Sequence, residues 1–185
     1  SSAASDVYKR QGEEMADNQV FSFILRSEAP TLDPWTNNSG DQSVIIAAIH
    51  EPLLRKNTDG SWSPGLCTDY VKSDDSKTHT LTLRTDAKWQ DGSSITMDDV
   101  MYSIERAISP ETASSIAYRY FPILNAEAFF TGEVDFDQVG VKAPDDHTIV
   151  FTTTEPCDFF IDMVTADSMA PIQKAAAENL GELYG

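Results

Sequence analysis

The chain has 185 residues, of which 41% are hydrophobic and 23% charged, a composition typical of a folded globular protein. Its 30 Asp and Glu residues outnumber 13 Lys and Arg residues, and the formal net charge is -17. Nucleic acids and anionic membrane surfaces are bound through positive patches, and the sequence contains no Lys/Arg cluster. We therefore expect neither as a partner.

The first predicted element is a strand over residues 20–27 ("VFSFILRS"), whose apolar positions on both faces are typical of a central strand. A long polar loop with two prolines follows over residues 29–43. Asp41 is predicted to cap a helix over residues 42–50, which Pro52 closes. The predicted buried stripe of this helix comprises Val44, Ile45, Ala48 and Ile49.

The next segments predict a β-hairpin and a helix. Alternating residues 79–84 follow the turn formers "KSDDSK" and are expected to pair with a strand near "DYVKS", and Asp91-Gly92 predicts a tight turn. Thr96 is predicted to cap the helix that follows, together with Asp99 three residues on, and Ser109-Pro110 ends it. The expected buried stripe comprises Val100, Met101, Ile104, Ala107 and Ile108.

The carboxyl-terminal part mixes strands and helices. Residues 147–156 predict a strand, and residues 158–166 predict a short amphipathic helix. Another helix is expected over residues 172–180, after Pro171 and before Gly181. Because these elements show no regular βαβ alternation, the expected fold class is α+β or irregular α/β.

Sequence motifs for chemistry are few. Cys67 and Cys157 are interpreted as buried free thiols, with a disulfide as the alternative. The histidines His50, His79 and His147 have no metal-ligand spacing, and the acidic doublets fall in turns and helix starts. No phosphate-binding glycine loop or nucleophile elbow occurs, so nothing indicates an enzyme or a cofactor.

Three tryptophans, Trp35, Trp62 and Trp89, lie in or beside predicted loops. A flat amphipathic ring in such a position can stack on a ligand or cover a small apolar cluster. The sequence alone leaves both roles open for each of the three.

Several segments, read in order, resemble one family. They are "LDPW", "HEPLL", "PGL", "LTLRTDAKWQDGSSITMDDVMYSIERAISP", "TAS", "VGVKAPDDHTIVFTTTEP" and "MAPIQKAAAENLGELYG". They look like the amino-terminal part of the family 5 solute-binding proteins of ABC importers, in the oligopeptide-binding branch. The resemblance implies an incomplete fold of the periplasmic-binding-protein type II, and no enzymatic activity.

The same resemblance implies a division of the chain. Residues 12–19 are expected to be a disordered lead-in, 20–50 the amino-terminal part of ligand-binding lobe I, 51–170 a small family-specific α/β domain, and 171–185 the truncated start of a return into lobe I. Residues 1–11 ("SSAASDVYKRQ") resemble the translation of a transposase sequencing-library adapter. We expect those eleven residues to be an artefact without packed structure.

The resemblance also implies ligand-binding residues and partners. Asn38, Ser39 and Gly40 correspond to the loop that supplies main-chain contacts to the peptide, and Ile116 stands where the family relative carries a ligand-facing tyrosine. The implied protein is an extracytoplasmic monomer, periplasmic or lipid-anchored, that passes peptides to a membrane permease. A nickel chelate, an oligosaccharide or an opine are alternative ligands, and a hydrolase using acidic residues is the alternative of another class.

Overall fold

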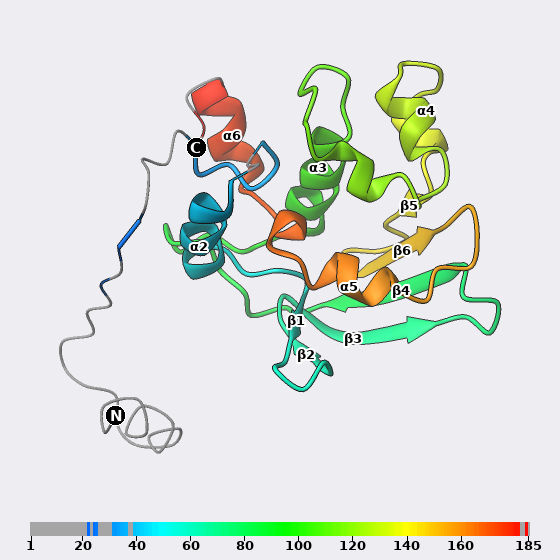
Figure 1. Ribbon diagram of the computed structural model, residues 1–185, viewed down its shortest axis with the longest axis horizontal. Coiled ribbons are helices and arrows are strands. Elements are labelled where there is room, and N and C mark those ends of the chain that lie inside the picture. Colours follow the sequence, from blue (N-terminus) through cyan, green and yellow to red (C-terminus); the bar gives the residue numbers. More distant parts are fainter. Residues whose placement is uncertain (1–21, 23, 26–30, 37–38, 182–183, 185) are drawn as a thin grey trace.

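The structure is a computed structural model, and it describes residues 22, 24–25, 31–36, 39–181 and 184. The helices are α2 (Gly40–Ile49), α3 (Met97–Ala107), α4 (Ala126–Phe130), α5 (Phe160–Val164) and α6 (Lys174–Leu180), with 3₁₀ turns η1 (Ala117–Tyr120), η2 (Phe136–Gln138) and η3 (Asp167–Met169). The strands are β1 (Leu54–Lys56), β2 (Trp62–Pro64), β3 (Cys67–Lys72), β4 (Thr78–Leu83), β5 (Val141–Lys142) and β6 (Thr148–Thr152). Helices and antiparallel strands are mixed, which confirms the expected class (Figure 1). No helix within these residues is long and apolar enough to cross a bilayer.

A four-stranded antiparallel sheet in the order β3-β4-β6-β5 forms the centre, and β1 and β2 form a separate hairpin. The predicted pairing of β3 with β4 is confirmed, with Leu81 opposite Tyr70. On its other side Leu81 lies opposite Ile149 of β6. β6 is shorter than the predicted strand 147–156. Thr153 follows it and forms an isolated bridge with Ile123, while its N–H bonds to the carbonyl of Lys77.

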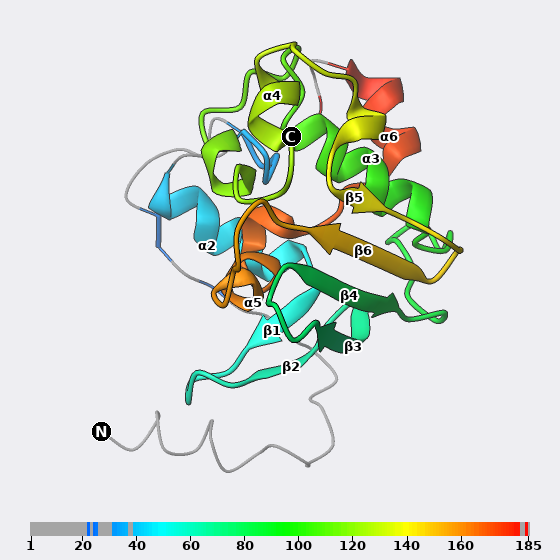
Figure 2. The same cartoon turned by 90° about the vertical axis from the view of Figure 1, so that its right-hand side faces the viewer.

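The sheet buries one face. His79, Leu81 and Leu83 alternate with exposed or half-buried threonines along β4, and Ile149 and Phe151 alternate with half-buried residues along β6. In Figure 2 the strands β6, β4 and β3 lie one below another beneath α3. The hydrophobic core contains residues of both α3 and α5. The alternation in the sequence is therefore the pattern of a sheet that is covered on one side.

Helix α3 begins as predicted. Thr96 Oγ1 accepts from the N–H of Asp99, and Asp99 Oδ2 accepts from the N–H of Thr96 at 2.9 Å, so the capping box is complete. The same carboxylate accepts from Trp89 Nε1 at 3.2 Å, and its Oδ1 accepts from the N–H of Lys174 at 2.9 Å. Asp99 therefore joins the start of α3 to the start of α6, and the two helices lie side by side (Figures 1 and 2).

Helix α2 differs from the prediction. It begins at Gly40 with Ser39 at the N-cap position, so Asp41 lies inside the first turn and is not the cap. In that position the Asp41 carboxylate interacts favourably with the positive end of the helix dipole. The predicted stripe is also wrong, because Gln42 and Ile46 are the buried residues of α2, whereas Val44 and Ile49 are 50% and 58% exposed.

Two carboxyl-terminal helices are shorter than predicted. The segment 158–166 forms only α5, after which the chain turns into η3. α6 begins three residues after Pro171, because Gln173 at the N-cap position is still extended. Gly181 ends α6 as predicted, with a φ of 55° that favours glycine.

Two further expectations can be compared with the structure, and the others fall mostly or wholly outside the described residues. Cys67 and Cys157 are both buried and free, so the free-thiol interpretation is confirmed and the disulfide alternative is wrong. The tight turn is confirmed, with Gly92 at a φ of 87°. The predicted strand 20–27 falls mostly outside the described residues; its described residues Ser22, Ile24 and Leu25 lie in no strand. The predicted artefact, residues 1–11, and lead-in, residues 12–19, lie wholly outside them.

We predict that Asp99→Ala lowers the free energy of unfolding by about 2–4 kcal/mol, because four polar hydrogens lose a buried acceptor: those on Trp89 Nε1, the Lys174 N–H, and the N–H and hydroxyl of Thr96. Asp98→Ala is the matched control, since Asp98 is exposed in the same first turn and contributes about 0.3–1 kcal/mol through the helix dipole. Urea denaturation followed by circular dichroism measures both. Equal losses in the two variants would contradict the role assigned to Asp99.

We also predict that the protein loses stability as the pH falls below about 6.5. His79 is buried, stacked 4.0 Å from the ring of Phe160, and its Nδ1 lies 2.9 Å from the hydroxyl of Tyr70. Burial lowers the pKa of His79 despite the opposing effects of the Ser76 carbonyl and of nearby carboxylates. The unfolded chain therefore binds the proton more readily, and stability is complete only above the unfolded pKa.

The measurement is the melting temperature between pH 8 and pH 5. His79→Phe should flatten its pH dependence, whereas His147→Gln, which alters an exposed side chain, should leave it unchanged. Some slope will remain, because burial also lowers the pKa of His50. An unaltered slope in His79→Phe would show that His79 does not determine it.

Candidate functional site

The loop before α2 is fixed by a buried carboxylate. Asp33 is 1% exposed, and its Oδ1 accepts from the N–H of Trp35 at 2.9 Å. Its Oδ2 lies 2.6 Å from Nη1 of Arg106 at the end of α3, in an ion pair whose arginine side chain is 21% exposed. The "LDPW" turn is thereby attached to a helix more than seventy residues later in the chain.

Trp35 continues this attachment. Its side chain is fully buried, and its ring lies 5.6 Å from that of Tyr120 at 45°. Ser114 donates from its hydroxyl to the Trp35 carbonyl, and Tyr120 donates to the carbonyl of Ser168. Three segments far apart in sequence, at 33–35, 114–120 and 168, therefore meet at one junction.

A polar hollow of about 380 Å³ opens beside this junction. We call it the polar hollow; it is lined by Pro34, Ser39, Gly40, Ser43, Ile46, Arg119, Thr165, Ala166, Asp167 and Ser168. Burial raises the pKa of Asp167, and nearby His50 partly opposes that shift. The exposed Arg119 supplies the positive charge in the lining.

A larger hollow of about 700 Å³ lies at the other end of α2. It is lined by residues 48–51, Leu66, 88–91, Ile95, Pro171, Gln173, Ala176 and Tyr184. Of the ligand-binding residues predicted from the sequence, the three that the structure describes, Ser39, Gly40 and Ile116, do not line it. For this reason the polar hollow is the better candidate site, although it is smaller.

The described residues contain no group of three or more His, Cys, Asp or Glu side chains that could hold a metal ion. Burial raises the pKa of Cys67 to about 12, which keeps this thiol protonated and unreactive at neutral pH. The chemistry available in the polar hollow is therefore that of hydrogen bonds and charge, supplied by hydroxyls, main-chain groups, one guanidinium and one carboxylate.

Comparison with known proteins identifies the family. Residues 61–183 match the family described as "Bacterial extracellular solute-binding proteins, family 5 Middle". The chain belongs to this family. Family 5 proteins are solute-binding proteins rather than enzymes, so the resemblance seen in the sequence is confirmed and the hydrolase alternative has no support.

Individual relatives agree with this assignment. The chain is 35% identical over 175 residues to the periplasmic oligopeptide-binding protein OppA of Escherichia coli, covering 94% of this chain and 32% of that protein. The substrate-binding domain of an oligopeptide ABC transporter from Bacillus anthracis superposes with a TM-score of 0.87 at 34% identity, covering 94% of this chain and 33% of that one. Haemophilus influenzae OppA in complex with the peptide RPPGFSPFR gives a TM-score of 0.77 at 29% identity, covering 82% and 30%. This family 5 chain therefore spans about a third of the length of the relatives it matches.

The structure brings together two of the four ligand-binding residues predicted from the sequence. Ser39 and Gly40 line the polar hollow at the start of α2, and Asn38 lies outside the described residues. Ile116 is 4% exposed at the N-cap position of η1 and does not line the polar hollow. Its N–H bonds to Ser114 Oγ at 3.3 Å.

Arg119 is the basic residue of the polar hollow, and sequence reasoning missed it as it missed Thr165 and Asp167. It lies in η1, three positions after Ile116. Ser115, Ile116, Pro122 and Ile123, its neighbours at three and four positions, carry no acidic group. An arginine without a local acidic partner, next to a predicted ligand position, was the available signal.

The three tryptophans favour structural roles. Trp35 fills the junction, Trp89 donates to Asp99, and Trp62 is 37% exposed and packs edge-on at 6.0 Å against Tyr70. None of the three lines the polar hollow. The alternative that they cover small apolar clusters is therefore the better one for Trp35 and Trp62, whereas Trp89 also lines the larger hollow.

We predict that Arg106→Met lowers the free energy of unfolding by about 2–4 kcal/mol, because the buried carboxylate of Asp33 loses its charge partner. Asp33→Asn combined with Arg106→Met should recover part of this loss, since the amide oxygen of Asn can still accept from the N–H of Trp35. Urea denaturation of the two single variants and the double variant gives the coupling energy. Strict additivity would show that the ion pair does not fix the loop.

Proposed function

We propose that this chain is part of the substrate-binding component of an ABC importer that captures extended peptides outside the cytoplasm and delivers them to a membrane permease. The observation that carries the proposal is the position of Ser39 and Gly40 beside the polar hollow, in a chain 35% identical to a periplasmic oligopeptide-binding protein. Main-chain groups at such a loop can pair with a peptide backbone without reading its side chains.

The proposal includes a division of labour within the chain. Residues 20–50 contribute to ligand-binding lobe I, residues 51–170 form the small α/β domain, and residues 171–185 begin the return into lobe I. In support of this division, the Asp33–Arg106 ion pair and the Trp35 junction join the first segment to the second. These contacts would hold Ser39 and Gly40 in place while a second lobe closes on the peptide.

The test is isothermal titration calorimetry of the full-length gene product with unstructured tri- to pentapeptides. We expect saturable binding with the peptide recovered intact, as chromatography of the titrated sample would show. If the protein binds only a nickel chelate, an oligosaccharide or an opine, its ligand is that solute and not a peptide. Cleavage of the peptide would overturn the transport role.

A further inference from the structure

Arg119 carries an unpaired charge, whereas most of the basic side chains that the structure describes are paired. Six of the described basic residues form ion pairs: Arg55, Lys56, Lys72, Lys77, Arg84 and Arg106. Lys142 donates to the carbonyl of Asp137, and Lys174 lies over the ring of Tyr102. Within the part of the chain that the structure describes, Lys88 and Arg119 are the basic residues with no ion pair, side-chain hydrogen bond or ring contact. Lys88 lines the larger hollow, whereas Arg119 lines the polar hollow.

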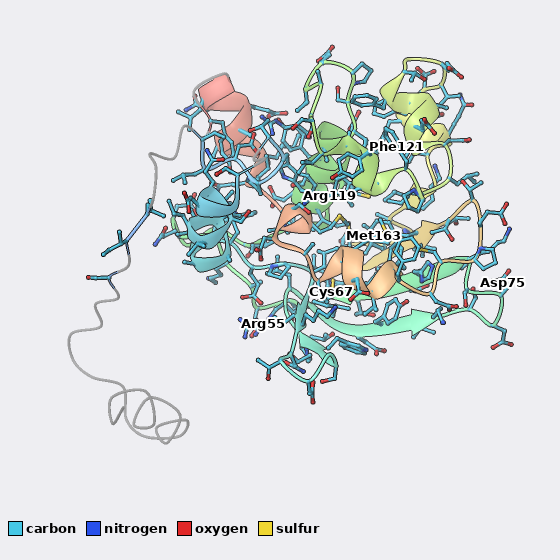
Figure 3. All side chains as sticks on the ribbon, in the orientation of Figure 1. Arg55, Cys67, Asp75, Arg119, Phe121 and Met163 are labelled. Atoms are coloured by element: carbon cyan, nitrogen blue, oxygen red, sulfur yellow. The ribbon has the colours of Figure 1, made fainter. Side chains whose placement is uncertain are left out.

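The position of Arg119 indicates why it is unpaired. Its backbone is held in η1, where its N–H bonds to the Ile116 carbonyl at 3.0 Å, and Tyr120 beside it is buried in the junction. The Arg119 side chain is exposed and extends from this fixed backbone into the linings of two hollows. Figure 3 shows Arg119 on this segment, close to Met163 of α5.

Two hollows of different character meet at Arg119. On one side is the polar hollow, with the hydroxyl-bearing residues Ser39, Ser43 and Thr165. On the other is an apolar hollow of about 350 Å³, lined by Arg119, Tyr120, Phe159, Asp162, Met163, Ala166, Ser168 and Met169. Of the acidic residues in these linings, Asp162 pairs with Lys56, and Asp167 has a pKa that is raised by burial and partly lowered again by His50.

We propose that Arg119 binds a carboxylate of the ligand and makes this protein prefer peptides that present one at the polar hollow. The inference rests on the proposed function and specifies its substrate class. A guanidinium binds a carboxylate through two parallel N–H···O bonds, which a main-chain loop cannot replace. The carboxylate belongs either to an Asp or Glu side chain or to the carboxyl terminus of the peptide.

A contact with a second lobe is the competing explanation for Arg119. A guanidinium that pairs with an acidic residue across the closing cleft would strengthen the binding of every peptide equally. A guanidinium that pairs with the ligand would strengthen the binding of carboxylate-bearing peptides alone. The two explanations therefore differ in selectivity rather than in overall affinity.

The experiment compares full-length wild type with Arg119→Gln, Arg119→Lys and the control Arg84→Gln, in which the altered arginine is exposed and paired with Asp86. The probes are tri-alanine, its carboxyl-terminal amide, and tripeptides with Glu or Gln at each position in turn. Calorimetry gives each dissociation constant, and thermal melting confirms that each variant is folded.

We expect Arg119→Gln to lose about tenfold in affinity for the peptides whose carboxylate it binds and to leave the other peptides unchanged. Arg119→Lys should retain part of the preference, because lysine keeps the positive charge but lacks the paired N–H donors of the guanidinium. Loss of the Glu-over-Gln preference identifies a side-chain carboxylate, and loss of the acid-over-amide preference identifies the carboxyl terminus.

Two results would overturn the inference while leaving the proposed function intact: an equal loss for all peptides, or no change in any dissociation constant. If wild type binds none of the peptides, the proposed function fails first and this inference fails with it. Arg84→Gln should match wild type throughout, and a selective loss in that variant would assign the preference to general surface charge.

Discussion

The buried carboxylate of Asp33 is the constraint on which the position of the candidate site depends. A buried charge is tolerated only when it is paired and hydrogen-bonded, and Asp33 meets both conditions through Arg106 and the N–H of Trp35. This requirement holds the "LDPW" turn against the end of α3. Burial of the Trp35 ring against Tyr120 then sets the direction of that turn. Ser39 and Gly40 follow within a few residues, so their place beside the polar hollow is a consequence of packing at the junction.

Elements whose signals are local could be predicted from the sequence. The capping box of α3 requires only Thr96 and Asp99 three residues apart, and the β3-β4 hairpin requires only an alternating pattern on either side of a turn. The buried face of α2 was predicted wrongly because every position from Val44 to Ile49 is apolar, so periodicity could not distinguish one face from another. Ile46 is buried because η3 packs against α2, and that contact joins residues far apart in the chain.

The candidate site was less predictable than the fold, because it is assembled from three distant segments. The resemblance to a family located Ser39 and Gly40, but no local pattern brings Thr165 or Asp167 to them. Ile116 was predicted by correspondence and is buried, whereas Arg119, one 3₁₀ turn later, lines the polar hollow. Correspondence with a family position predicts where the backbone of a residue lies, but it does not predict the direction in which the side chain points.

The net charge of -17 opposes the proposed preference for a ligand that bears a carboxylate. An acidic surface repels an anionic ligand at long range, but at physiological ionic strength charges more than about 8 Å apart are largely screened. Within that distance the sign of the local field decides, and in the polar hollow it is determined by Arg119 together with an Asp167 whose pKa is raised by burial. The lining carries one guanidinium and one carboxyl group, so its charges are balanced, whereas acidic residues outnumber basic ones in the protein as a whole. An incoming carboxylate therefore meets much less repulsion inside the polar hollow than the net charge of the protein would suggest.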